Sequence, residues 1–131
     1  MMLSAVDGWH EYMRSRDRQA LHDLLHPDAV FESPVVHTPQ RGRPIVLKYL
    51  VSADHVLGGP SFRYTGEWRN ERGAVLEFES EIEGLTINGM DMIRCTEDGA
   101  RIEHFKVMVR PLKAIQLVHR LMGEMLSAAS A

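Results

Sequence analysis

The sequence has a single cysteine, no long apolar run and no strong excess of either charge. Cys95 alone excludes an internal disulfide and any metal site that needs a CxxC pair. No apolar run approaches the roughly 20 residues of a membrane-spanning helix. Asp7 and Glu11 interrupt the N-terminal segment where a signal peptide requires a continuous apolar stretch. The sequence therefore predicts a cytoplasmic protein without a membrane segment.

The charge pattern also argues against nucleic-acid binding. The net charge is −3, and the acidic Glu67 and Glu71 are interleaved with Arg63 and Arg69 rather than separated from them. The seven histidines form no HxH, HExxH or histidine–carboxylate pair with the spacing of a metal site. We therefore expect neither nucleic acid, nor a metal, nor another cofactor.

What the sequence does contain is typical of one folded domain spanning residues 1–131. Hydrophobic residues make up 44% and charged residues 25% of the chain, as in ordinary globular proteins. We find no repeat, low-complexity segment or linker. Four helices are predicted from capping residues and from apolar residues at helical spacing. They begin near Ser4, Asp17, Pro44 and Pro111.

The remaining segments predict strands. "DAVFESP" (28–34) is a short strand that Pro34 closes, because proline cannot donate a ladder hydrogen bond. Four later segments alternate apolar and polar residues with a period of two, or are linked by hairpin turn signals. They span 62–69, 76–83, 86–95 and 101–110. Strands that follow one another and are separated from helices indicate an α+β fold with a strongly bent antiparallel sheet.

Three segments in this order resemble the nuclear transport factor 2-like superfamily and its SnoaL-like, ketosteroid-isomerase-like branch. They are "RDRQALHDLLHPDAVFESP", "RGRPIVLKYL" and "INGMDMIRCTEDGARIEHFKVMVRP". The resemblance implies a cone-shaped, cystatin-like α+β barrel wrapped around N-terminal helices, with a C-terminal helix and an interior pocket. Family members include isomerases, dehydratases, epoxide hydrolases and polyketide cyclases, and also non-catalytic binding modules, so the fold does not decide the function.

Asp91 is the first candidate for chemistry. In "NGMDMIR" the alternation places Gly89, Asp91 and Ile93 on one face, so Asp91 enters the barrel if Ile93 does. Burial raises the pKa of a carboxyl, which then donates a hydrogen bond or a proton. In ketosteroid-isomerase-like members an Asp at the matching position donates to an oxyanion. The alternative is an ionised carboxylate held by backbone N–H groups or by an arginine.

A catalytic base is harder to find. Ser33 stands where ketosteroid-isomerase-like sequences carry a carboxylate, and a serine cannot abstract a proton from carbon without an activating base. Ser33 instead orients a ligand or bonds to the turn before Pro34. Glu32 should face the opposite side and pair with an arginine or solvent. His37, in the following loop, is the best-placed general base.

The predicted ligand-binding residues come from the first helix and from the inner sheet face. By resemblance, Trp9 takes the place of a helix-borne tyrosine, and Tyr12 offers a hydroxyl nearby, although aromatic residues at this spacing also form cores. The full set is Trp9, Tyr12, Ser33, Phe62, Tyr64, Phe78, Phe105 and Val107.

The opposite sheet face carries methionines. The alternation turns Met90, Met92 and Met108 outward, and methionine is better suited to an interface than to solvent. This pattern predicts a homodimer that packs sheet against sheet. The alternative is that the chain's own last helix covers this face.

Three functions remain open from the sequence. The chain binds a small hydrophobic molecule without a defined activity, or it is a cyclase, isomerase or dehydratase that uses Asp91 as acid or hydrogen-bond donor. In the third, the pocket is collapsed and the chain is a protein-interaction module.

Overall fold

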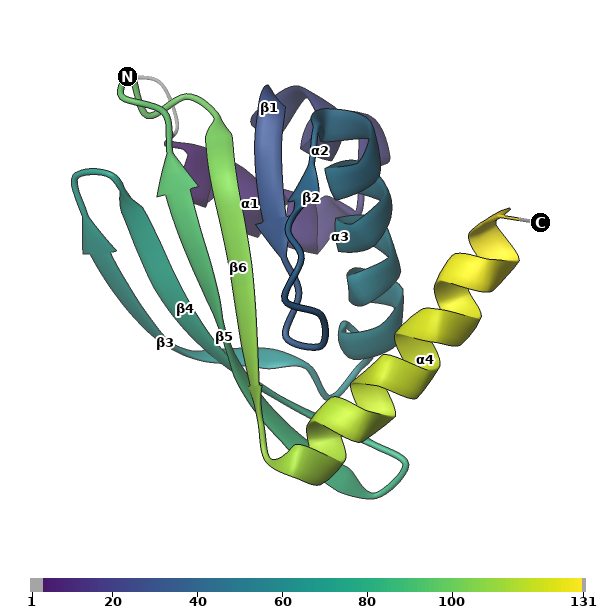
Figure 1. Ribbon diagram of the computed structural model, residues 1–131. Helices are drawn as coiled ribbons and strands as arrows, with labels where there is room; N and C mark the ends of the chain where they lie inside the picture. Colours follow the sequence, from purple (N-terminus) through teal and green to yellow (C-terminus); the bar gives the residue numbers. More distant parts are fainter. Residues whose placement is uncertain (1–3, 131) are drawn as a thin grey trace.

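The computed structural model describes residues 4–130, in which four helices pack against one six-stranded sheet (Figure 1). The helices are α1 (Ala5–Ser15), α2 (Arg18–Leu24), α3 (Arg43–Leu57) and α4 (Leu112–Ser130). The strands are β1 (Leu25–Glu32), β2 (Gln40–Arg41), β3 (Arg63–Asn70), β4 (Gly73–Ile82), β5 (Leu85–Cys95) and β6 (Ile102–Arg110). None of the helices in residues 4–130 combines the length and the hydropathy of a membrane-spanning segment.

The predicted helix starts are confirmed for α1 and α2. The Ser4 hydroxyl accepts a hydrogen bond from the backbone N–H of Asp7 at 3.2 Å and donates to the Asp7 carboxylate at 3.0 Å. Asp17 accepts hydrogen bonds from the backbone N–H groups of Gln19 and Ala20. Both caps satisfy donors that a first helical turn leaves without partners. They fix where the two N-terminal helices begin.

The sheet follows the order β2-β1-β6-β5-β4-β3 and does not close. The α+β class and the C-terminal helix are confirmed, but the sheet is mixed rather than wholly antiparallel. β1 pairs with β6 in parallel, while the other neighbours are antiparallel. The parallel pairing is possible because α3 and the strands β3, β4 and β5 separate β1 from β6 in sequence, whereas a tight hairpin joins only antiparallel strands.

β1 differs from its prediction at one end. The strand begins at Leu25 instead of residue 28 and includes Pro27, which the ladder tolerates because the register to β6 shifts between Leu25 and Val30. The strand ends at Glu32, ahead of Pro34, as predicted. The two-residue β2, which pairs with Val30 and Phe31, has no counterpart in the prediction.

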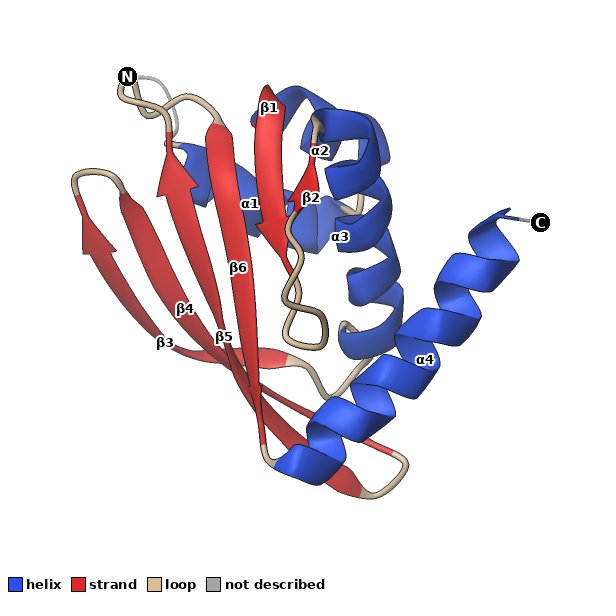
Figure 2. Cartoon of the chain, in the orientation of Figure 1, coloured by secondary structure: helices blue, strands red, loops and turns tan. Residues whose placement is uncertain are grey.

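The helices α1, α2 and α3 cover one face of the curved sheet, and α4 starts at the lower end of β6 and runs up beside α3 (Figure 2). Large buried side chains from both layers fill the space between them, among them Trp9, Phe31, Phe78 and Phe105. Along β5, Ile87, Gly89, Asp91 and Ile93 face this interior, as the alternation predicts. Asp91 therefore enters the core side of the sheet.

Candidate functional site

A cavity of about 240 Å³ lies between the inner face of the sheet and the helices α1, α3 and α4. Most of its lining is aromatic or aliphatic. Eight of the ten predicted site residues line it: Trp9, Ser33, Phe62, Tyr64, Phe78, Asp91, Phe105 and Val107. The structure thus brings these side chains to one place, and their roles in binding stay predictions.

A chain of hydrogen bonds joins α1 to β5 through β3. The Trp9 indole N–H donates to the Tyr64 hydroxyl oxygen at 2.8 Å, and the Tyr64 hydroxyl donates to Asp91 Oδ2 at 2.6 Å. Asp91 is 6% exposed, and its partner is a phenol rather than the arginine or backbone N–H groups of the predicted alternative. Trp9 and Tyr64 together hold one oxygen of the carboxyl in place.

Burial raises the pKa of Asp91 to about 7. The hydrogen bond from Tyr64 lowers this pKa in part, and the charge of Asp54 raises it. Burial and the neighbouring Asp91 charge also raise the pKa of Tyr64 well above its usual value, so Tyr64 stays a hydrogen-bond donor. Near neutral pH, Asp91 therefore exists in both the protonated and the ionised form.

Asp54, on α3, is a second acidic residue of the cavity, and sequence reasoning missed it. Its burial raises its pKa to about 6, although hydrogen bonding from Tyr12 and the charge of Arg16 lower it. Among the described residues, its Oδ2 is buried without a hydrogen-bond partner. The signal was present in the sequence, because Asp54 follows Leu47 and Leu50 at helical spacing on the buried side of α3.

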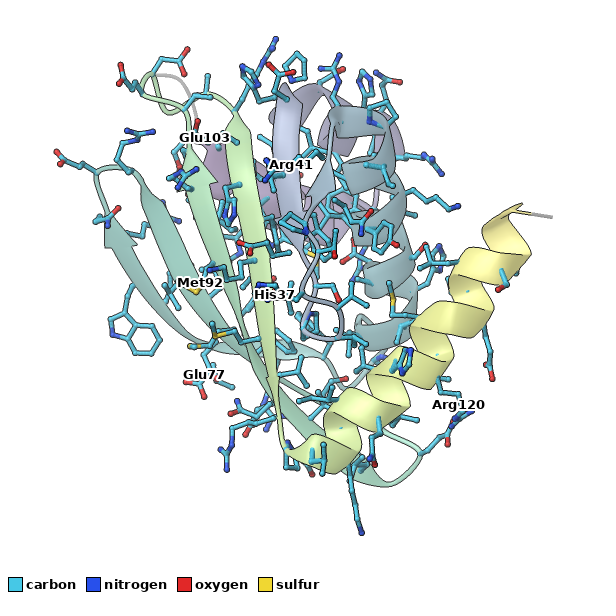
Figure 3. The ribbon with its side chains drawn as sticks, viewed as in Figure 1. His37, Arg41, Glu77, Met92, Glu103 and Arg120 are labelled. Carbon is cyan, nitrogen blue, oxygen red and sulfur yellow. The ribbon has the colours of Figure 1, made fainter. Side chains whose placement is uncertain are left out.

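The two predicted site residues that do not line the cavity are Tyr12 and His37. Tyr12 is buried behind Trp9, and its ring centroid lies 5.4 Å from that of Trp9. His37 is exposed on the loop between β1 and β2 (Figure 3). The prediction that His37 is the base is not supported by this position. A different histidine, His119 of α4, lines the cavity although its side chain is exposed.

The segment after β1 is organised by Ser33. Its hydroxyl oxygen accepts hydrogen bonds from the backbone N–H groups of Val35 (2.9 Å) and Val36 (3.3 Å). This is the turn role that the sequence left open. It uses the two acceptor positions of the hydroxyl oxygen, and the O–H is a separate donor. Glu32 faces the other side of the sheet, where it pairs with His104 at 2.7 Å and Lys106 at 3.5 Å instead of an arginine.

The described residues include no group of three or more histidine, cysteine or acidic side chains arranged to hold a metal ion. The chemistry that these side chains offer is hydrogen bonding and proton transfer. The two carboxyl groups differ in surroundings: Tyr64 donates to Asp91, whereas the buried Oδ2 of Asp54 receives no hydrogen bond from residues 4–130.

Comparison with known proteins places this chain in a family. A family model described as a SnoaL-like domain matches residues 6–104. A solved steroid delta-isomerase from Pseudomonas aeruginosa is 38% identical, with a TM-score of 0.88, over 95% of this chain and 90% of that chain. An uncharacterised protein with a cystatin-like fold from Silicibacter pomeroyi is 27% identical, with a TM-score of 0.82, over 92% of this chain and 83% of that chain.

A third structure shows the fold alone. It is a hypothetical protein from Catenulispora acidiphila with a ketosteroid isomerase-like fold, in complex with trimethylamine. It is 15% identical, with a TM-score of 0.62, over 88% of this chain and 91% of that chain. No curated protein matches the sequence.

Proposed function

Because the chain belongs to the SnoaL-like family of the nuclear transport factor 2-like superfamily, we propose that its cavity binds a small, largely apolar carbonyl compound. Asp91 donates a hydrogen bond to the carbonyl oxygen. The observation that carries this proposal is a buried carboxyl with a pKa of about 7 in a mainly apolar cavity wall. A few polar groups placed among apolar walls are typical of small-molecule sites.

The direction of the Tyr64 hydrogen bond defines how Asp91 meets a ligand. Tyr64 donates to Oδ2, so Oδ2 is the accepting oxygen of the carboxyl. The proton of neutral Asp91 then resides on Oδ1, the oxygen that Tyr64 does not engage. A ligand oxygen that accepts this proton's hydrogen bond is a carbonyl or an enolate. Such a bond is strong because Asp91 is buried, in surroundings less polar than water.

The size and lining of the cavity limit the ligand. A volume of about 240 Å³ is smaller than the roughly 300–1,000 Å³ of drug-sized sites, so the ligand is compact. The likeness to a protein described as a steroid delta-isomerase supports a carbonyl ligand. The open cavity beside Asp91 favours this function over a protein-interaction module with a collapsed pocket.

The proposal is tested with 2-tetralone, a compact ketone, and with tetralin, the same ring system without the oxygen. In calorimetric titrations at pH 6, Asp91→Leu is expected to weaken 2-tetralone binding at least tenfold, about 1.4 kcal/mol, and to leave tetralin binding unchanged or stronger. The difference between the ligands isolates the hydrogen bond to the carbonyl oxygen.

Asp23→Asn is the control, since Asp23 lies exposed on α2. This variant should bind 2-tetralone as the wild type does. Equal affinity of the wild type for ketone and hydrocarbon, or equal 2-tetralone affinity of Asp91→Leu and the wild type, contradicts the proposal.

We further propose that the outer sheet face forms a homodimer. Met90 and Met108 lie opposite each other in the β5–β6 pairing and are 36% and 47% exposed, and Trp68 on β3 is 60% exposed. Met92, labelled in Figure 3, lies on the same face of β5. Exposed apolar side chains gathered on one face of a sheet are typical of an interface.

The dimer is tested by sedimentation at micromolar concentration. The wild type is expected at twice the 14.9 kDa mass of one chain, and Met108→Glu at that mass, because it buries an unpaired charge in the interface. Ile45→Glu, which adds the same charge at an exposed site on α3, should remain dimeric. A monomeric wild type would remove this proposal.

A further inference from the structure

We propose that Asp54 is a catalytic base that makes the cavity a proton-transfer site. It removes a proton from the carbon next to the carbonyl group of the ligand, while Asp91 donates a hydrogen bond to the carbonyl oxygen. This inference rests on the proposed function, because it needs a carbonyl compound bound at Asp91. It goes further by assigning the base that the sequence lacks at Ser33.

Asp54 has the position that such a base requires. It lies on the helical wall of the cavity, on α3, whereas Asp91 lies on the sheet wall, on β5, and both line the same space. The charge of Asp54 acts on both Asp91 and Tyr64, so the two acidic groups are within electrostatic reach of each other. A compact ligand in this cavity therefore meets both carboxyl groups.

The unpaired oxygen of Asp54 is the second observation. Oδ2 is buried without a hydrogen-bond partner among the described residues, although burying such an atom typically costs about 1–3 kcal/mol. The Tyr12 hydroxyl hydrogen-bonds to the Asp54 carboxyl, and the charge of Arg16 also acts on it. Neither engages Oδ2, so this oxygen is left for an acidic hydrogen of a ligand.

The other candidates for the base are less suited to it. The Ser33 hydroxyl is held by two backbone N–H groups, and His37 is exposed outside the cavity lining. His119 lines the cavity from α4, but its side chain is exposed. Asp54 combines burial with a free oxygen, and a carboxylate shielded from water is a stronger base than a solvated one.

The step balances without a further reactant. The C–H bond next to the carbonyl breaks, its hydrogen forms an O–H bond with Asp54, and the electron pair moves through the new C=C bond to the carbonyl oxygen. The Asp91 O–H group stabilises the enolate oxygen that forms. Return of the proton from Asp54 to the same carbon restores the ketone, and exchange results in D2O when a solvent deuteron replaces that proton on Asp54 before it returns. Its return to a different carbon of a conjugated system gives an isomer.

The two carboxyl groups must be in opposite protonation states, and their surroundings favour this order. Burial raises the pKa of both carboxyl groups, and the charge of an ionised Asp54 raises the pKa of Asp91 further, so ionisation of Asp54 favours a neutral Asp91. Pairs of acidic groups separated in this way are typical of acid–base sites. The charged and titratable groups around Asp54 are Tyr12, Arg16, Asp91 and Tyr64, with His119 across the cavity.

The test follows hydrogen–deuterium exchange at C1 of 2-tetralone in D2O by NMR, together with the dissociation constant of the same ketone. The wild type is expected to accelerate exchange over buffer. Asp54→Asn is expected to lower the protein-catalysed rate at least a hundredfold, as loss of a general base does, and to change the dissociation constant less than threefold. In the wild type the exchange rate should rise with pH near pH 6, as Asp54 ionises. This rise should be absent in Asp54→Asn.

Asp23→Asn, the same change at an exposed carboxyl of α2 outside the cavity lining, is the matched control and should keep the rate within threefold of the wild type. Wild-type-like exchange by Asp54→Asn, or loss of exchange in Asp23→Asn, overturns the assignment of Asp54. Binding of 2-tetralone without exchange also overturns it and leaves the proposed function standing. If the wild type does not distinguish 2-tetralone from tetralin, the proposed function itself fails, and this inference fails with it.

Discussion

Above pH 7, the variant Asp91→Asn is expected to be about 4 kcal/mol more stable than the wild-type protein. Burial raises the pKa of Asp91 from 3.8 to about 7, and each unit of such a shift corresponds to about 1.36 kcal/mol. Asparagine keeps the shape of the side chain and an oxygen that accepts the Tyr64 hydrogen bond. It removes the cost of holding a carboxylate in the cavity wall.

The pH dependence has a defined sign. Because the folded state binds the Asp91 proton more tightly than the unfolded state does, the stability from this group is fully present below pH 3.8. It is lost as the pH rises through about 7. The difference in unfolding free energy between Asp91→Asn and the wild type should therefore increase between about pH 4 and pH 7. It should be constant above pH 8.

Urea unfolding at pH 5, 7 and 9 checks this expectation. Asp23→Asn is the control, because the pKa of this exposed carboxyl is lowered rather than raised, mainly by the hydrogen bond to His22. The difference in unfolding free energy between Asp23→Asn and the wild type should be the same at pH 5 and at pH 9. In a protein that already carries Asp54→Asn, the substitution Asp91→Asn should increase the unfolding free energy by less. The reason is that the charge of Asp54 no longer raises the pKa of Asp91. A gain that is independent of pH would contradict the assignment of the raised pKa.

Asp91 thus lowers the stability of the native protein at neutral pH. Residues that lower stability in this way are concentrated at functional sites. The same reasoning applies to Asp54, whose buried oxygen has no partner among the described residues. Two such residues in one cavity connect the stability of the fold to the proposed chemistry.

Much of this arrangement follows from local patterns in the sequence. The alternation in β5 predicts that Gly89, Asp91 and Ile93 share the inner face, and the structure places them there. Such patterns succeed because side chains of a strand alternate between two faces. The predicted start of β1 was wrong because the true start depends on pairing with β6, about 75 residues later in the chain.

The hydrogen-bond chain could not be predicted for the same reason. Tyr64 and Asp91 lie on β3 and β5, and β4 separates them in the sheet. Their contact depends on the register of both strand pairs and on the bend of the sheet, neither of which a sequence pattern specifies. Asp54 was overlooked because a single acidic residue in a helix is usually solvated.

Tyr64→Phe is expected to raise the pKa of Asp91 and to destabilise the protein by about 1–3 kcal/mol. The substitution removes the hydrogen bond that lowers the pKa of Asp91, and it also leaves the Trp9 indole N–H without its acceptor. Both effects are unfavourable because the groups are buried. A neutral Asp91 then persists to higher pH, so binding of 2-tetralone should extend further into the alkaline range than in the wild type.

An NMR titration of the ¹³C-labelled aspartate carboxyl groups, with Asp91 assigned by its absence in Asp91→Asn, measures this shift directly. Tyr49→Phe is the matched control, because Tyr49 also lines the cavity and packs against Phe31. It should leave the titration of Asp91 unchanged. If Tyr64→Phe lowers the pKa of Asp91 or leaves it unchanged, the phenol does not stabilise the ionised carboxylate. The hydrogen-bond donor on Oδ2 would then have to be another group, and the proton of neutral Asp91 would no longer be assigned to Oδ1.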